Sequence, residues 1–495
     1  MLLRSASGSS PASAESATYL AELAYAQCMR THGVPGFPEP NPSRNFSVGG
    51  QVTANPGSPA ARAIAACEHL LPGASTGTSG ATPPATAGSP GAGLGDCLAD
   101  QPACYAPRQF RVAYGITPLL DRAITGRGVT VVLPEEAETG PPQPQPPVGI
   151  LQSVTDIRQD VTEFDSRFGL PQARIQVLTT TLAGSSAAPW LASVEEVEDT
   201  ELVHTVAPDA TIVELLVEPA DVSTPAKFAA TWATAVRIAA RHGWVISQSG
   251  IGQDFNLAEG SWTSAEVATM NSALAYAAGR HVTVVVASGD QGAIGNGSTT
   301  PVKSIILPTS DPLVLAAGGT SLTANPVTGA YIGETAWNDP PGQEGPSSSG
   351  GGFSTLFARP AYQDGVPGIG AMRGMPDVAA DGDSATGMAI AIGAPGGGYE
   401  FFGGGGTSAA APFWAGLIAL ADQEAGHPLG FVNPAIYRIA RGPLYHRAFH
   451  DITTGDNTVV LNGVTVTGYQ AGPGWDPVTG WGTPDAQVLI PLLAH

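Results

Sequence analysis

A serine follows a run of four glycines in the segment GGGGTSAAAPFWAGLIAL, which spans residues 403–420. The glycines allow the backbone to turn sharply and a second molecule to approach closely. The apolar run after Ser408 predicts a buried helix, and we expect Pro412 in its first turn, where the missing N–H costs nothing. Ser408 would then lie where backbone donors and the helix dipole favour developing negative charge. The segment indicates either a nucleophile or an ordinary N-cap serine after a flexible loop.

A nucleophilic serine needs a general base within hydrogen-bond reach and a group that orients the base. The stretch SVEEVEDTELVHTVAPDATI begins at Ser193, and Ser193 forms a capping-box pair with Glu196 that predicts the start of a helix. Glu195 and Asp199 are four residues apart, so they share one face of this helix. Two carboxylates at that spacing can share a proton, and their pKa values then separate. One could act as the base while the other orients it.

Spacing alone favours a simpler interpretation, an acidic and solvated helix face. Glu196, Glu198 and Glu201 are expected to belong to such a face. A histidine base, as in a His-based serine hydrolase, is the alternative chemistry. The nine histidines occur in no HGT motif, however, and no DSG or DTG follows the first predicted strand. A single histidine such as His204 is expected on a helix surface or in a loop.

A third carboxylate lies at the end of the segment HVTVVVASGDQG, which predicts a strand. Asp290 directly follows this strand, and the carboxyl ends of strands are where an α/β enzyme exposes catalytic side chains. A protonated Asp290 could donate a hydrogen bond to an oxyanion. The sequence SGDQG also fits an Asx-type turn, which is the simpler alternative.

Strands and helices alternate along most of the chain. Apolar runs predict strands at 128–136, 210–219, 244–250, 281–290 and 312–319, and helical stretches lie at 228–243 and 264–280. This order predicts an α/β fold with a mostly parallel central sheet covered by helices on both faces.

Three regions differ in composition along the chain. Residues 1–71 resemble a small helical module, and residues 72–96 form a Gly/Ser/Pro-rich linker. Residues 97–495 form the large domain. The N-terminal module could itself be the functional part, binding cell-envelope material.

Composition limits the partners and the compartment. The chain has 495 residues and a formal net charge of -21 at pH 7, which argues against nucleic acid and anionic membranes as partners. No apolar run reaches membrane-spanning length. Two disulfides in an extracellular or cell-envelope protein are expected, although the N-terminal MLLRSASGSSPASAES lacks the apolar core of a signal peptide. The four cysteines that support this expectation are Cys28, Cys67, Cys97 and Cys104.

From about residue 104 onward the chain resembles the sedolisin family, the serine-carboxyl peptidases, which are similar to subtilisins with a glutamate in place of the histidine. The motifs that carry the resemblance occur in order: YAPRQFRVAYGI, EVEDTELVHTVAPDATI, ASGDQG, SSSGGGFS, GGTSAAAPFWAG, and HDITTGDN with YQAGPGWDPVTGWGTPD. The resemblance implies a subtilisin-like fold and a serine-type peptidase.

The resemblance also implies roles for four residues. Ser408 is the nucleophile, Glu195 is its general base and then its general acid, and Asp199 hydrogen-bonds Glu195. Asp290, protonated in acid, joins the Ser408 backbone N–H in the oxyanion hole. A glutamate base has an ordinary pKa of about 4.3, and Asp290 donates only while it keeps its proton. We therefore expect activity in acid.

One structural Ca²⁺ is implied near the C-terminus. Its ligands would be the side chains of Asp451 and Asp476 and the backbone carbonyls of Ile452, Gly472 and Gly474. Hard oxygen ligands of this kind suit Ca²⁺. The alternative is a pair of Asp-rich turns without a metal.

The function implied is an endopeptidase that acts on proteins or peptides through an acyl-enzyme, and a monomer is expected. A tripeptidyl-peptidase and a catalytically silent relative that binds peptides remain open. Glu135 matches a second glutamate that extends the carboxylate network in some relatives. At the position of the tryptophan that pairs with this glutamate the chain has Gly250, so the extended network is expected to be incomplete.

Overall fold

The computed structural model describes residues 104–136, 152–180, 191–217, 224–249, 257–342, 345–394 and 397–495. The chain divides into two units, Met1–Pro90 and Gly91–His495, and every described residue belongs to the second. The predicted module at 1–71 and linker at 72–96 lie outside the described residues.

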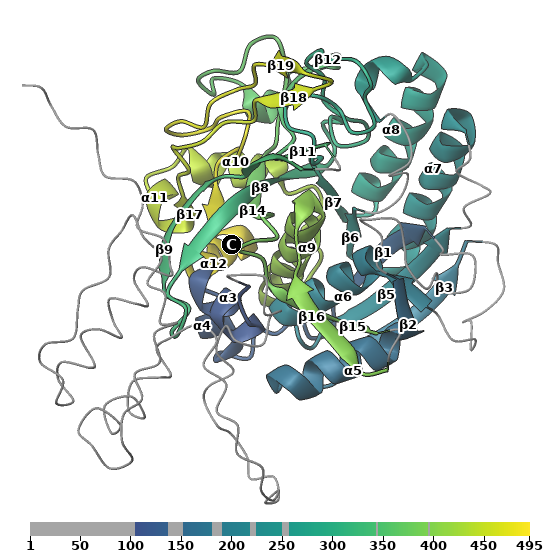
Figure 1. Ribbon diagram of the computed structural model, residues 1–495, viewed down its shortest axis with the longest axis vertical. Helices are drawn as coiled ribbons and strands as arrows, with labels where there is room; N and C mark the ends of the chain where they lie inside the picture. Colours follow the sequence, from purple (N-terminus) through teal and green to yellow (C-terminus); the bar gives the residue numbers. More distant parts are fainter. Residues whose placement is uncertain are drawn as a thin grey trace, which may run out of the picture. The chain divides into compact units, whose positions relative to one another are not determined.

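An eight-stranded sheet forms the centre of the second unit, in the order β14-β8-β7-β6-β1-β5-β3, with β9 paired to β8 (Figure 1). Neighbours along the path are parallel, and only β9 is antiparallel among these strands. The predicted, mostly parallel sheet is therefore confirmed. Its strands are β1 (Thr130–Glu136), β3 (Arg174–Thr179), β5 (Thr211–Val217), β6 (Val245–Gln248), β7 (Thr283–Ala287), β8 (Leu315–Ala324), β9 (Tyr331–Ala336) and β14 (Val378–Asp381).

The remaining described strands form two-stranded ladders around the sheet. They are β2 (Gln152–Asp156) with β4 (Leu191–Ser193), β10 (Asn338–Gly342) with β11 (Gly345–Ser348), β12 (Gly352–Ala358) with β13 (Met372–Met375), β15 (Ala389–Gly393) with β16 (Tyr399–Gly403), β17 (Phe449–His450) with β20 (Thr483–Pro484), and β18 (Val459–Leu461) with β19 (Val464–Val466).

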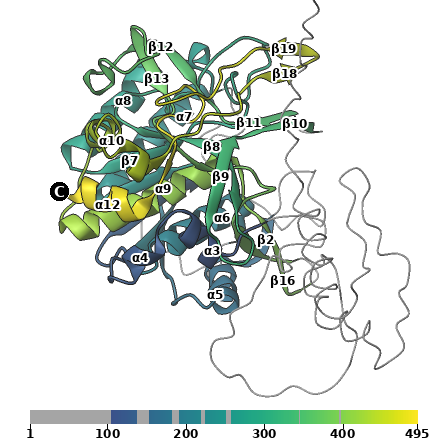
Figure 2. The same ribbon diagram turned by 90° about the vertical axis from the view of Figure 1, so that its left-hand side faces the viewer.

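Helices cover both faces of the sheet because its strands are apolar on both sides. In β1, Val131 and Leu133 pack in the core that contains α9, whereas Val132 packs in the core that contains α7 and α8. These layers can be followed in Figures 1 and 2. The helices are α3 (Pro107–Ala113), α4 (Thr117–Leu120), α5 (Ile157–Phe168), α6 (Val194–Val206), α7 (Pro225–His242), α8 (Ser264–Gly279), α9 (Gly406–Ala425), α10 (Asn433–Ala440), α11 (Tyr445–Ala448) and α12 (Ala486–Ala494), with short 3₁₀ turns at Glu259–Ser261 and Ala361–Gln363.

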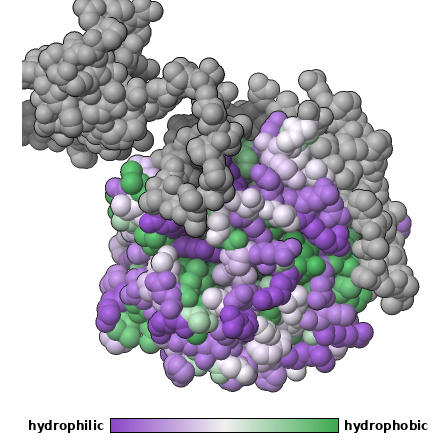
Figure 3. All heavy atoms as spheres, turned by 90° about the horizontal axis from the view of Figure 1, so that it is seen from below, coloured by the Kyte–Doolittle hydropathy of each residue, from purple (hydrophilic) through white to green (hydrophobic). Residues whose placement is uncertain are grey.

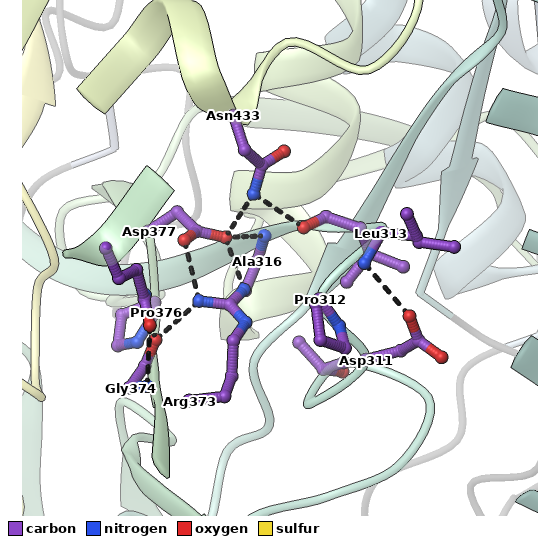
Figure 4. Close-up of polar contacts among 12 residues, drawn as sticks. Asp311, Pro312, Leu313, Ala316, Arg373, Gly374, Pro376, Asp377 and Asn433 are labelled. Atoms are coloured by element: carbon purple, nitrogen blue, oxygen red, sulfur yellow. Dashed lines mark hydrogen bonds and ion pairs between the residues drawn. The ribbon is translucent and has the colours of Figure 1, made fainter. Parts of the chain in front are cut away.

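A fully buried ion pair anchors the amino-terminal edge of the sheet beside β8 (Figure 4). Arg373 donates two hydrogen bonds of 2.8 and 2.7 Å to the two carboxylate oxygens of Asp377. The same carboxylate accepts from the backbone N–H of Ala316, the amide of Asn433 and the hydroxyl of Tyr437. Because both Asp377 oxygens are fully used, the charge is compensated in the interior, as a buried ion pair requires.

The surface of the described residues is mixed in character. Hydrophilic and hydrophobic residues are interspersed over the face seen in Figure 3. Within the described ranges, no helix is long and apolar enough to cross a bilayer. Cys104 is disulfide-bonded, as expected, and the other three cysteines lie outside the described residues.

Candidate active site

Ser408 is held by the first turn of α9. The helix begins at Gly406, and its N-cap is Gly405, so the interpretation of Ser408 as an ordinary N-cap serine is wrong. Gly406 has a φ of 74°, a left-handed conformation that glycine adopts without strain. The glycine run therefore provides the turn that brings Ser408, 8% exposed, to the start of a buried helix.

Pro412 lies inside α9, beyond its first turn, so its predicted position was wrong. In an α-helix the N–H of this residue would donate to the carbonyl of Ser408, four residues earlier, but proline has no N–H. The hydroxyl of Ser249 donates to that carbonyl instead, at 3.3 Å. Ser249 follows directly after β6. Because Pro412 has no N–H, the carbonyl of Ser408 is available to a side chain from the edge of the sheet.

The predicted acidic helix is α6. Its capping box is confirmed: the N–H of Glu196 donates to the Ser193 hydroxyl, and the Glu196 carboxylate accepts from the Ser193 N–H. Asp199 is completely buried, and burial raises its pKa well above the ordinary value. The charge of Glu195 raises that pKa further, while the side chains of Glu135 and Ser249 partly oppose the rise. The structure thus brings Glu195 and Asp199 together, as their spacing predicts.

The carboxyl cluster extends to two strands of the sheet. Glu135, at the end of β1, is buried, and its pKa is raised by burial and then by the charges of Asp199 and Glu214. Glu214, on β5, accepts from the hydroxyl of Thr200, and burial raises its pKa to about 8. The match of Glu135 to an extended network is supported by this position, whereas Gly250 lies outside the described residues.

The predicted solvated face of α6 was wrong. Glu196, Glu198 and Glu201 are only 1%, 4% and 0% exposed, because α6 packs against α5, α9, β1 and β15. The expected surface position of His204 was also wrong. Its side chain is buried, and its Nε2 lies 2.9 Å from Asp165. A surface helix gathers its apolar residues in one stripe, whereas the valines and leucine of α6 are distributed around the helix, a pattern that indicates burial on all sides.

Asp290 reaches across from the end of β7 to the start of α9. Its Oδ1 accepts from the backbone N–H of Thr407 at 2.7 Å and from the Thr407 hydroxyl at 2.8 Å. Its own N–H donates to Asn296. Burial raises the pKa of Asp290, and the bonds from Thr407 partly oppose this. The Asp290 carboxylate therefore hydrogen-bonds the residue before Ser408 and does not form the predicted Asx turn.

All four residues predicted for the chemistry lie at one edge of the sheet. Glu195 and Asp199 come from α6, Asp290 follows β7, and Ser408 lies in the first turn of α9. The charges of the first three all act on Glu198, which lies among them. A serine at a helix N-terminus, with carboxyl groups of raised pKa around it, can support nucleophilic attack with acid–base catalysis.

Two neighbours of this site, Ser249 and Glu198, were missed as contributors. The proline four residues after Ser408 indicates, from the sequence alone, that the carbonyl of Ser408 needs another hydrogen-bond donor. For Glu198 the sequence carries no such signal, because its surroundings come from distant segments.

The residues predicted for calcium lie in two C-terminal loops. Asp451 accepts from the N–H of Gly474 at 3.0 and 3.1 Å, and Asp476 accepts from the N–H of Gly472 at 3.2 Å. Burial raises the pKa of Asp476 to about 6. Burial raises the pKa of Tyr445, and the charges of Asp451 and Asp476 raise it further, so both carboxylates lie near this tyrosine.

The donor chemistry of these loops suits a hard cation. In the part of the chain that the structure describes, no group of three or more His, Cys, Asp or Glu side chains could hold a metal. A cation here would therefore need backbone carbonyls beside the two carboxylates, and such all-oxygen sets fit Ca²⁺.

The fold and the arrangement of serine and carboxyl groups define a subtilisin-like protein. The model of the Subtilase family matches residues 179–438, and the chain belongs to this family. Its resemblance to the sedolisins is confirmed as well: Kumamolisin from Bacillus sp. (strain MN-32) is 41% identical over 242 residues, which cover 48% of this chain and 40% of that protein.

Other relatives agree with this placement. Sedolisin from Pseudomonas sp. (strain 101) is 35% identical over 229 residues, covering 43% of this chain and 35% of that protein. Tripeptidyl-peptidase 1 from Homo sapiens is 33% identical over 267 residues, covering 48% and 42%. The matched regions thus span about 35–42% of the length of these curated relatives.

A solved structure shows the same fold. Pseudomonas sedolisin, a serine-carboxyl proteinase complexed with two molecules of pseudo-iodotyrostatin, has a TM-score of 0.63 and 26% sequence identity. The match covers 79% of this chain and 97% of that one. The predicted subtilisin-like fold is confirmed.

A double-mutant cycle tests the role of Ser249. Ser249→Ala leaves the Ser408 carbonyl without its donor and should lower the free energy of unfolding by about 1–3 kcal/mol. Adding Pro412→Ala should restore part of this loss, because an alanine N–H can donate to that carbonyl. Urea denaturation measures both. Thr234→Ala, which removes a solvent-exposed bond to Ala230, is the control and should change stability by less than about 0.5 kcal/mol. Strictly additive effects of the two substitutions would contradict the assignment.

Stability should fall as pH rises, because buried carboxyl groups must ionise. Glu214 has a pKa of about 8 in the folded protein against an ordinary value of about 4.3, so between these values the folded state holds more protons than the unfolded state. The free energy of unfolding then decreases with pH across this window. Glu214→Gln cannot ionise and should flatten the decrease. Urea denaturation at half-unit steps from pH 4.5 to 8 measures the slope, and equal slopes in both proteins would refute the burial argument.

Proposed function

We propose that this chain is an acid-acting serine-carboxyl endopeptidase that hydrolyses peptide bonds through an acyl-enzyme on Ser408. The observation that carries the proposal is the bond from the backbone N–H of Thr407 to Asp290, which holds a carboxyl group of raised pKa against the residue that precedes Ser408. The pairing of Glu195 with Asp199 on the adjoining helix supports it. The relatives named as peptidases also support it.

We propose a role for each group in turn. Ser408 Oγ attacks the peptide carbonyl carbon while Glu195 takes the hydroxyl proton, and Asp199 keeps Glu195 oriented. The oxyanion that forms accepts hydrogen bonds from the Ser408 N–H and from protonated Asp290. Glu195 then gives its proton to the leaving amine, and the C–N bond breaks. Water repeats the sequence on the ester, releasing the acid and restoring Ser408.

Acid preference follows from two opposite requirements. Glu195 must be ionised to accept a proton, and Asp290 must be protonated to donate a hydrogen bond. Because burial raises the pKa of Asp290, its donor form persists above the ordinary range for an aspartic acid. Activity should therefore rise as Glu195 ionises and decline as Asp290 loses its proton.

Two alternatives are separable. A tripeptidyl-peptidase would use the same groups and differ in releasing tripeptides from free N-termini. A silent relative would bind peptides without cleaving them. The presence of all four groups at one edge of the sheet favours catalysis.

Cleavage of a mixed peptide library between pH 3 and 8 tests the proposal. We expect an optimum in acid, with internal cleavage sites, and a loss of at least about 10³-fold in Ser408→Ala and Glu195→Gln. His242→Ala, an exposed position on α7, is the control and should retain full activity. An optimum above about pH 7, or loss of activity in a histidine variant, would instead support a His-based hydrolase.

We further propose that Asp451 and Asp476, with the carbonyls of Ile452, Gly472 and Gly474, hold one structural Ca²⁺. The burial of Asp476 and the position of both carboxylates near Tyr445 support this. A bound cation would supply the counter-charge that these carboxylates need and would join the two loops.

Metal removal tests the calcium site. Chelation by EGTA should lower the thermal unfolding midpoint by several degrees, because bound ligand stabilises the folded state by mass action. Added Ca²⁺ should restore it, and Mg²⁺ should not. In Asp476→Asn the midpoint should be low already and insensitive to EGTA. An unchanged midpoint on chelation of the parent protein would overturn the assignment.

The compartment follows from the disulfide chemistry. Cys104 is disulfide-bonded, and such bonds persist in oxidising surroundings. We therefore propose an extracellular or cell-envelope location, where protein and peptide substrates are accessible. A monomeric state stays a prediction.

A further inference from the structure

One buried carboxyl group lies among the residues of the proposed mechanism and has no part in it. Glu198 precedes Asp199 on α6 and is 4% exposed. Three charged groups act on its carboxyl group: Glu195 and Asp199 on the same helix, and Asp290 after β7. Glu201 lies one turn further along α6, and its pKa is raised by burial and also by the charge of Glu198. A carboxyl group in this position influences the site whether or not it touches a substrate.

Glu198 contacts the glycine run that leads into the serine. The backbone N–H of Gly405 donates to its carboxyl group. A Cβ atom on Gly404 would lie only 2.5 Å from Glu198 Oε1, so a larger residue there would displace the Glu198 carboxyl group. Gly405 is the N-cap of α9 and has no side chain with which to cap the helix. Asp290 accepts the N–H of Thr407 and so supplies the acceptor that an N-cap side chain would otherwise provide. Glu198, from the neighbouring helix α6, accepts the N–H of the N-cap residue itself, as the second side chain of a capping box does.

Three consecutive amides before Ser408 each have an acceptor. The N–H of Gly405 donates to Glu198, and that of Gly406 donates to the carbonyl of Gly382 at 2.7 Å. The N–H of Thr407 donates to Asp290 at 2.7 Å. Because the next amide is the proposed oxyanion donor of Ser408, the orientation of that donor depends on these three bonds.

We propose that Glu198 is a positioning residue of this active site, which accepts the Gly405 amide and so fixes the backbone that orients Ser408. The inference rests on the proposed peptidase function. It differs from the roles of Glu195, Asp199 and Asp290, because Glu198 positions Ser408 through the glycine segment and takes no part in proton transfer or in the oxyanion hole.

The proposed reaction is favoured when Glu198 carries no charge. Burial raises its pKa well above the ordinary value, and the charges of Glu195, Asp199 and Asp290 raise it further, against the single opposing bond from Gly405. A neutral acid still offers its carbonyl oxygen to the amide. An ionised Glu198 would place negative charge beside Asp290 and the forming oxyanion, which would oppose the reaction. A glutamine should therefore replace Glu198 better than an apolar residue of similar size.

Kinetics of three variants test this role on the full chain, with one peptide substrate from pH 3 to 7. Glu198→Leu removes the acceptor, and kcat should fall at least tenfold while KM stays within twofold. Glu198→Gln keeps an uncharged acceptor and should recover most of that loss, with the acid limb of the pH profile unshifted. Glu201→Leu is the matched control. It removes a buried glutamate that accepts the amide of Ala391 at 2.9 Å, and it should leave kcat within twofold.

Amide hydrogen exchange gives a readout that needs no catalysis. Peptides covering residues 403–413 should exchange faster in Glu198→Leu than in the parent protein and in Glu198→Gln, and Glu201→Leu should leave this segment protected. If the parent protein cleaves no peptide but Glu198→Leu loses protection here, the peptidase proposal fails and the positioning role stands. If Glu198→Leu changes neither kcat nor exchange, or if Glu198→Gln loses as much kcat as Glu198→Leu, the positioning role is wrong.

Discussion

The packing of α6 against α9 is the constraint on which the rest of the site depends. It places an acidic helix beside the helix that carries Ser408 in its first turn, and it excludes water from most of the acidic side chains. Carboxyl groups in such surroundings cannot all be ionised, because the interior neither solvates nor compensates their charges. Their pKa values rise together, and Glu135, Glu198, Asp199 and Glu214 all show this effect. Such crowding allows one carboxyl group to keep its proton at a pH at which another has lost it.

The two edges of the central sheet differ in how their buried charges are compensated. At the amino edge, Arg373 and Asp377 form a closed pair with every carboxylate oxygen satisfied. At the carboxyl edge, acidic groups lie close to one another, and they accept hydrogen bonds from backbone amides and hydroxyl groups. The first arrangement holds strands and helices in place through a compensated pair of charges. The second changes with pH, and we expect both stability and activity to follow its titration.

Backbone groups connect the carboxyl cluster to the serine. The amides before Ser408 donate to Glu198 and Asp290, and the Ser408 carbonyl accepts from Ser249 because Pro412 offers no N–H. The serine is thus held through its own main chain on both sides, by groups from α6, β6 and β7. This explains how a residue after four glycines can have a defined position despite the flexibility of glycine in an unconstrained chain.

Much of this protein could be predicted from the sequence alone. The apolar runs at β1, β5, β6, β7 and β8 determined a parallel sheet with two covered faces, and Ser193 with Glu196 determined where α6 begins. The spacing of Glu195 and Asp199 was sufficient to pair them, because neighbours on one helix turn are fixed by local geometry. Motif order was sufficient to identify the family, while the roles of the site residues stay proposals.

Only the tertiary structure decided what surrounds those residues. Glu196, Glu198, Glu201 and His204 have the composition of a solvated face, yet they are buried, because segments distant in the chain close over α6. The bond between Asp290 and Thr407 joins residues 117 positions apart. The same holds for Glu198 and the glycine run more than 200 residues later. Sequence patterns report the periodicity of one element, whereas burial and long-range hydrogen bonds depend on which elements pack together. The sequence therefore determined the elements and the candidate groups, and the packing of α6 on α9 decided their environment and charge.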